Sequence, residues 1–207
     1  MSILGKKYPI SKTTLNKMRE KPDAFRILIS CLLSLRTQDK NTEIASDRLF
    51  QVADTPEKIL KLPIKKIEKL IYSSGHYKKK ARTIKHVSGV IIRKFHGKVP
   101  ETREELMSIK GIGPKTANIV LSFAFGELVL PIDTHCHRIP NRLGWVKTKT
   151  PEQTEIELSK ILPKKYWREF NSIFVQFGKT ICQPVSPLCS ACPINKYCPR
   201  IGVKRSR

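Results

Sequence analysis

The length, composition and charge of the chain narrow its class: it has 207 residues, and 40 lysines and arginines against 17 aspartates and glutamates leave a formal net charge of +23. This length allows one large or two small domains. A protein this basic usually binds a polyanion, and nucleic acid is the first candidate. A ribosome-associated protein, or one with a merely solvated basic surface, would have the same composition. No stretch reaches the ~18 apolar residues of a membrane span, and the first residues lack a signal peptide, so we expect a cytoplasmic protein without membrane contact.

Apolar periodicity predicts helices along most of the chain, whereas alternating strand patterns hardly occur. Asp23 is a candidate N-cap of a central buried helix. Thr102 and Thr150 each stand three residues before a Glu or Gln, at capping-box spacing. Gly75 marks a helix end, and the basic tail 204–207 is expected to fray. The predicted helical stretches are 23–35, 41–52, 54–62, 64–75, 76–97, 102–107, 114–125, 134–143, 150–162 and 164–182, and the short connections between them favour an all-α protein.

The stretch "ELMSIKGIGPKTANIVLSF" reads as helix, tight glycine turn and helix. Gly111 and Gly113 permit backbone angles that other residues avoid and leave amide N–H groups uncovered. Pro114 suits the first turn of the second helix. Such a turn at a helix N-terminus can hold backbone phosphate without reading base sequence, and Lys110 adds charge to it. A packing joint without a ligand is the alternative.

Lys115 and Asp133 are candidate catalytic residues. Lys115 lies near a positive helix end, beside apolar surface, in a very basic chain; these effects disfavour the ammonium form and favour a nucleophile that forms Schiff bases. A plain phosphate-binding lysine is the alternative, and the hairpin residues alone favour it. Asp133 precedes a predicted helix and could be only its N-cap, or it could take a proton from an amine and stabilise a sugar cation.

Four cysteines stand close together near the C-terminus with intervening intervals of six, two and five residues. They are Cys182, Cys189, Cys192 and Cys198. In a cytoplasmic protein this density argues for a metal and against disulfides. Thiolates select zinc or iron–sulfur, and the compact loop with a single Cys-x-x-Cys pair favours iron–sulfur over zinc. Cys31 and Cys136 lie in apolar or helical context and read as buried thiols.

Together, the hairpin "IKGIGPKTAN", the following "IDTHCHRIPNRLG" and the cysteine spacing resemble endonuclease III, the helix–hairpin–helix DNA glycosylase/AP lyase family, over residues 25–200. The resemblance implies two helical domains with a DNA-binding cleft between them. One is a helical barrel formed by residues 17–127. The other joins residues 1–16 to 128–207 and carries a [4Fe-4S] cluster on the four cysteines.

The resemblance also implies a mechanism. Lys115 would attack the sugar C1′ of a flipped nucleotide, expel the damaged base and form a Schiff base. β-Elimination would then cut the strand 3′ to the lesion. Asp133 would activate the amine or stabilise the sugar cation. The partner would be double-stranded DNA with oxidised pyrimidines or abasic sites, in the cytoplasmic nucleoid, and we expect a monomer.

Several residues depart from the family pattern. Ile109-Lys110 replace the usual Leu-Pro before the hairpin glycines. Arg36 stands where the family often has the Gln that fills the space left by the flipped base, and Arg36 or Gln38 could take that role. His76 stands where the family has an apolar or aromatic wedge; it could stack on a base or be an ordinary surface residue. His135 could meet a phosphate or serve only in helix packing.

Two other functions compete with this hypothesis. A mismatch glycosylase that removes thymine or uracil opposite guanine would use the same fold, although Lys115 argues for lyase activity as well. An iron–sulfur DNA-binding module without chemistry would need neither Lys115 nor Asp133.

Overall fold

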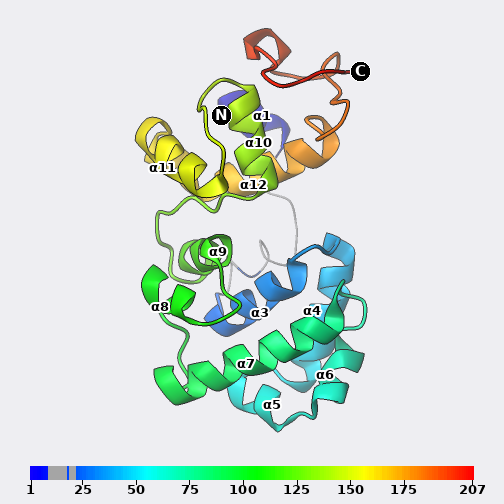
Figure 1. Cartoon of the computed structure of the whole chain (residues 1–207), viewed down its shortest axis with the longest axis vertical. Helices are drawn as coiled ribbons and strands as arrows, with labels where there is room; N and C mark the ends of the chain where they lie inside the picture. Colours follow the sequence, from blue (N-terminus) through cyan, green and yellow to red (C-terminus); the bar gives the residue numbers. More distant parts are fainter. Residues whose placement is uncertain (9–17, 19–21) are drawn as a thin grey trace. The chain divides into compact units, whose positions relative to one another are not determined.

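The structure is a computed structural model that describes residues 1–8, 18 and 22–207 of the chain (Figure 1). All regular secondary structure in these residues is helical, which confirms the predicted all-α class. None of these helices combines the length and apolar composition of a bilayer span. The chain divides into two units, Met1–Ser11 with Leu128–Arg207, and Lys12–Glu127. The sequence-based boundaries at 16/17 and 127/128 remain predictions, and the first lies outside the described residues.

The unit Lys12–Glu127 is organised around one buried helix. Its helices are α3 (Ala24–Ser34), α4 (Asp39–Val52), α5 (Pro56–Lys61), α6 (Ile64–Leu70), α7 (Tyr77–Phe95), α8 (Arg103–Ser108) and α9 (Pro114–Ala124). Asp23 caps α3 by accepting a hydrogen bond from the backbone N–H of Arg26 at 2.9 Å. Side chains 27–33 of α3 are almost fully buried, and α3 packs against α4, α7 and α9. The sequence alone predicted this helix as the core because it is apolar on most sides.

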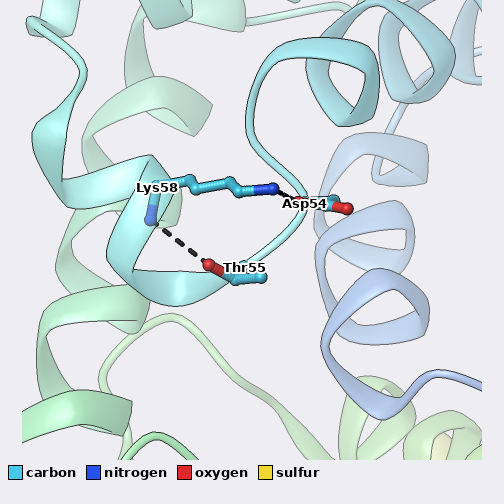
Figure 2. Close-up of polar contacts among 3 residues, drawn as sticks. All are labelled: Asp54, Thr55 and Lys58. Atoms are coloured by element: carbon cyan, nitrogen blue, oxygen red, sulfur yellow. Dashed lines mark hydrogen bonds and ion pairs between the residues drawn. The ribbon is translucent and has the colours of Figure 1, made fainter.

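Threonine caps fix where several helices begin. The hydroxyl of Thr55 accepts from the N–H of Lys58 at 3.3 Å, and the Lys58 amine pairs with Asp54 at 2.8 Å (Figure 2). Thr102 accepts from the third N–H of α8 at 3.3 Å. Thr150 caps its helix in the same way. The predicted caps at Thr102 and Thr150 are therefore confirmed, and each supplies an acceptor to an N–H group of the first helical turn that has none within the helix.

The predicted helix 64–75 ends earlier than expected, because α6 stops at Leu70 and not at Gly75. The intervening residues turn instead, and the hydroxyl of Ser74 donates to the carbonyl of Leu33 at 2.9 Å. A serine that bonds to a distant carbonyl competes with continued helix formation. The connection between α6 and α7 is consequently held against the end of α3.

The other unit has a separate aromatic core. Its elements are α1 (Ser2–Lys7), α10 (Thr134–Arg142), α11 (Pro151–Ile161), η1 (Lys164–Tyr166), α12 (Trp167–Thr180) and η2 (Asn195–Tyr197). Phe170, Phe174 and Phe177 of α12 are almost fully buried, and α12 packs against α1 and α10. The tail that was expected to fray is bound: the N–H of Arg207 donates to the carbonyl of Pro187, and its carbonyl accepts from the N–H of Ser190.

Candidate functional site: the hairpin, the capped aspartate and the cysteine pocket

The two glycines of the hairpin between α8 and α9 differ in what they require. Gly111 has φ +106°, and a Cβ there would lie 2.7 Å from Cγ2 of Thr83 on α7. Only glycine fits this position without rearrangement. Gly113 has φ −102°, which any residue adopts, so the predicted special backbone angle is wrong for Gly113. A Cβ on Gly113 would meet no heavy atom within 4 Å, so this glycine instead keeps the surface of the turn bare.

The hairpin leaves the start of α9 open. Gly113 is the N-cap residue and has no side chain to accept from the first turn, while Pro114 occupies the first helical position as predicted. The N–H groups of that turn have no acceptor within the helix. Lys110 is exposed in the turn, whereas Ile112 is buried and anchors it. These features are what a phosphate-binding turn needs.

Lys115 is the second residue of α9 and is half-buried. The residues after it, 116–123, are all buried. Lys115 lies near Cys31 of α3: burial raises the pKa of the Cys31 thiol to about 12, and the Lys115 charge acts in the opposite direction. Cys31 is thus the buried thiol that was predicted. Lys115 therefore lies at the edge of a packed core.

Asp133 is the N-cap of α10, as one of its two predicted roles required. Its Oδ1 accepts from the N–H of His135 at 2.9 Å and from that of Cys136 at 2.8 Å. The side chain is half-buried, so two amide donors and the helix dipole hold the carboxylate in one orientation. Lys115 and Asp133 belong to different units, and their joint action in catalysis stays a prediction.

His135 packs inside its own unit. A Cβ on Gly178 of α12 would clash with the His135 ring, so Gly178 makes room for the histidine. The ring Nδ1 also lies 3.1 Å from Nη2 of Arg138, and this guanidinium donates to the carbonyl of Cys182 at 2.7 Å. The packing role of His135 is therefore observed, and its contact with a phosphate stays a prediction.

The three residues predicted to enter the duplex lie on two neighbouring connections. Arg36 and Gln38 stand between α3 and α4, and His76 directly precedes α7. All three are exposed. Arg36 and His76 have φ values of 52° and 57°, the left-handed region that disfavours residues with a Cβ. Their roles in DNA remain predictions.

The four cysteines line one pocket. Cys182, Cys189, Cys192 and Cys198 share it with apolar side chains such as Ile139 and Phe177. Burial raises the pKa of the Cys192 and Cys198 thiols, and the neighbouring cysteines add to this effect. Four thiolates in such a pocket need a positive centre to be stable together. Among the described residues, however, no three His, Cys, Asp or Glu side chains converge on a single metal ion.

Arg142 of α10 supports this pocket and was missed by sequence reasoning. It is 8% exposed, and its guanidinium donates to the carbonyls of Gln183 and Pro184 at 2.6 and 2.7 Å. It also lies 3.4 Å from the Cys182 sulfur. Its burial could have been predicted from its place three residues after the buried Ile139, on the apolar side of the helix. Arg142 ties the first part of the cysteine loop to α10.

Comparison with known proteins agrees with these features. A family model described as HhH-GPD superfamily base excision DNA repair protein matches residues 29–164. An endonuclease III from Thermotoga maritima is 48% identical over 176 residues, which cover 85% of this chain and 83% of that protein. A non-covalent endonuclease III–DNA complex has a TM-score of 0.86 at 34% identity, and covers 96% of this chain and 92% of its own.

A trapped covalent intermediate of endonuclease III with DNA, in an estranged-adenine complex, has a TM-score of 0.81 at 32% identity, with 97% of each chain covered. The matched region includes the hairpin, Lys115 and Asp133. The chain therefore belongs to the HhH-GPD superfamily of base excision DNA repair proteins, within its endonuclease III family.

Proposed function

We propose that Lys115 is the nucleophile, and Asp133 its partner, of a bifunctional DNA glycosylase/AP lyase that excises oxidised pyrimidines. The enzyme class itself follows from the family: the chain is a base excision repair glycosylase and AP lyase that acts on DNA. A DNA-binding module without chemistry is accordingly set aside. One observation carries the residue assignment. Lys115 stands in the first turn after the hairpin glycines, and a structural relative of this fold has been trapped covalently on DNA.

The reaction begins with the neutral amine of Lys115. Its lone pair bonds to the deoxyribose C1′, the bond from C1′ to the base breaks, and the base leaves with that electron pair and a proton. The second amine proton passes to O4′ as the C1′–O4′ bond breaks and the sugar ring opens, and a C1′=N Schiff base results. Loss of a proton from C2′ then expels the 3′ phosphate oxygen, which cuts the strand. Asp133 takes the proton of the amine or stabilises the cationic sugar, and its two amide bonds keep it oriented.

The DNA is held by its backbone and opened at the lesion. The open N-terminus of α9, with bare Gly113 and exposed Lys110, would bind a phosphate. Arg36 or Gln38 would fill the space of the flipped nucleotide, and His76 would wedge the duplex. Flipping costs a few kcal/mol, and a damaged or missing base lowers that cost. The basic surface, with its +23 charge, supplies the compensating affinity.

The cysteine pocket fits a [4Fe-4S] cluster. In such a cluster each thiolate binds a different iron, so the four sulfurs surround one object without meeting at one point. A zinc ion instead needs all four sulfurs at about 2.3 Å from one centre. The four thiols share one pocket, and the compact loop with a single Cys-x-x-Cys pair supports the cluster over zinc. When bound, the cluster supplies four cross-links that hold the loop 182–198, and the reaction does not pass through it.

Borohydride trapping tests the proposal. Purified protein is mixed with duplexes that contain an abasic site or thymine glycol, and sodium borohydride reduces any Schiff base to a stable adduct. We expect an adduct with the wild type and none with Lys115→Gln. The exposed Lys98→Gln removes the same charge and should trap like the wild type. An adduct of equal yield in Lys115→Gln would contradict the assignment. A panel with thymine or uracil opposite guanine decides whether a mismatch glycosylase describes the substrate better.

A further inference from the structure

A buried lysine joins the two connections that carry Arg36 and His76. Lys80, in the first turn of α7, is 7% exposed. Its amine donates to the carbonyl of Leu33 at 2.7 Å, and to the hydroxyls of Thr37 and Ser74 at 2.8 Å each. An ammonium has three donors, and here all three are used. We call Lys80, Thr37 and Ser74, with the Leu33 carbonyl, the lysine knot.

The knot links segments that are far apart in sequence. The Thr37 hydroxyl also accepts from the N–H of Gly75 at 3.1 Å, and the Ser74 hydroxyl donates to the Leu33 carbonyl. A Cβ on Gly75 would lie 2.9 Å from the carbonyl oxygen of Arg36, so the two backbones touch. The connection after α3 and the connection before α7 therefore contact each other and are joined by hydrogen bonds through Lys80.

The knot also explains two unfavourable backbone conformations. Arg36 precedes Thr37 and His76 follows Gly75, so each flanks a knot contact. Both have a Cβ and left-handed φ, at 52° and 57°. Such conformations persist only where the surroundings over-determine them. Both side chains are exposed, so the core does not depend on them, and the constraint fixes the backbone from which they leave the surface.

A lysine is a costly way to join two loops. The three acceptors are uncharged, and burial lowers the pKa of Lys80 to about 8. A buried charge of this kind destabilises the fold relative to an apolar side chain of similar length, and it is retained where a unique arrangement matters. This argues that the geometry of the knot, and not its stability, is what the lysine provides.

We infer that Lys80 is a positioning residue for DNA engagement: through Thr37 and Ser74 it sets the spacing and direction of Arg36 and His76 at the lesion. This inference rests on the proposed function, because it assumes that these two residues enter the duplex. It predicts that the knot affects duplex substrates and the preference for the opposite base, and leaves the chemistry of Lys115 intact.

The test compares Lys80→Met with Lys79→Met, its exposed neighbour on α7. Borohydride trapping rates are measured on a single-stranded abasic oligonucleotide and on duplexes with each of the four bases opposite the abasic site. We expect Lys80→Met to keep the single-strand rate, to lose about tenfold or more on duplexes, which corresponds to ~1.4 kcal/mol, and to lose its opposite-base preference. Lys79→Met should keep that preference.

A second pair guards against misfolding of Lys80→Met. Thr37→Val removes a knot acceptor at a half-buried position, and Thr37→Ser retains it. Valine should reproduce the duplex defect and serine should restore wild-type behaviour. A duplex profile of Thr37→Val that equals that of Thr37→Ser would overturn the inference, as would a Lys80→Met profile that equals that of Lys79→Met. Absence of trapping by the wild type on every substrate, single-stranded and duplex, would instead refute the proposed function.

Discussion

Asp133 has two roles that a pair of substitutions can separate. Its Oδ1 accepts two backbone N–H groups of α10, at 2.9 and 2.8 Å. Asp133→Ala removes the acceptor of both hydrogen bonds and should cost ~1 kcal/mol, within the usual range of about 0.5–2 kcal/mol for an N-cap. Asp133→Asn keeps an oxygen in the same place and loses only the carboxylate charge, so we expect a loss of a few tenths of a kcal/mol.

Catalysis, unlike stability, should fail in both variants. Asparagine cannot take a proton from the Lys115 amine, and it lacks the charge that stabilises a sugar cation. Loss of a positioned acid–base group lowers rates by about 10²–10⁴-fold. Asp133→Asn should therefore fold nearly as stably as the wild type and yet cleave abasic duplexes at least about 100-fold more slowly. Asp133→Ala should lose both stability and activity.

Two measurements decide the matter. The melting temperature should fall by about 2–4 °C for each kcal/mol of stability lost in a chain of this size. The alanine variant should therefore melt at a measurably lower temperature than the asparagine variant. Single-turnover strand cleavage gives the rate. Wild-type cleavage by Asp133→Asn would reduce Asp133 to a helix cap. Equal melting of the two variants would refute the capping argument.

Three further predictions follow from the hairpin, the lysine knot and the cysteine pocket. Gly111→Ala should unfold at a lower urea concentration than the wild type, because the new Cβ would clash with Thr83 and the backbone has a positive φ there. Gly113→Ala should unfold like the wild type, but fluorescence anisotropy should show that it binds an abasic-analogue duplex more weakly. Burial lowers the pKa of Lys80 from 10.5 to about 8, so between these pH values the unfolded chain binds one more proton than the folded chain. The free energy of unfolding of the wild type should therefore rise with pH relative to that of Lys80→Met, by at most about 1.4 kcal/mol per pH unit. Urea midpoints that shift equally with pH in the two proteins would contradict this. Purified protein should be yellow-brown and contain iron, and Cys198→Ser should lose the colour; a colourless protein with stoichiometric zinc would refute the cluster.

Local signals predicted most of the helices. The caps at Asp23, Thr102 and Thr150 were readable because a cap acts on amides only two or three residues away. The same holds for Asp133, whose capping role needs no knowledge of the rest of the chain. The hairpin with Lys115 was readable for the same reason, since glycine and proline act on their own backbone.

Long-range contacts account for the places where the structure differs from the sequence-based predictions. α6 ends at Leu70 because Ser74 bonds to Leu33, a contact across 41 positions. Lys80 is the last of three consecutive lysines, and only its place four residues before the buried Ile84, on the apolar side of α7, sets it apart. The tail is ordered by Pro187 and Ser190 on another loop. No local pattern reports such partners.

The central claim is that the amine of Lys115 bonds to deoxyribose C1′. The most direct measurement is peptide mapping of the borohydride-reduced adduct by tandem mass spectrometry after digestion of both protein and DNA. We predict that the sugar remnant lies on Lys115 alone. A remnant on Lys110 or any other lysine, with Lys115 unmodified, would contradict it.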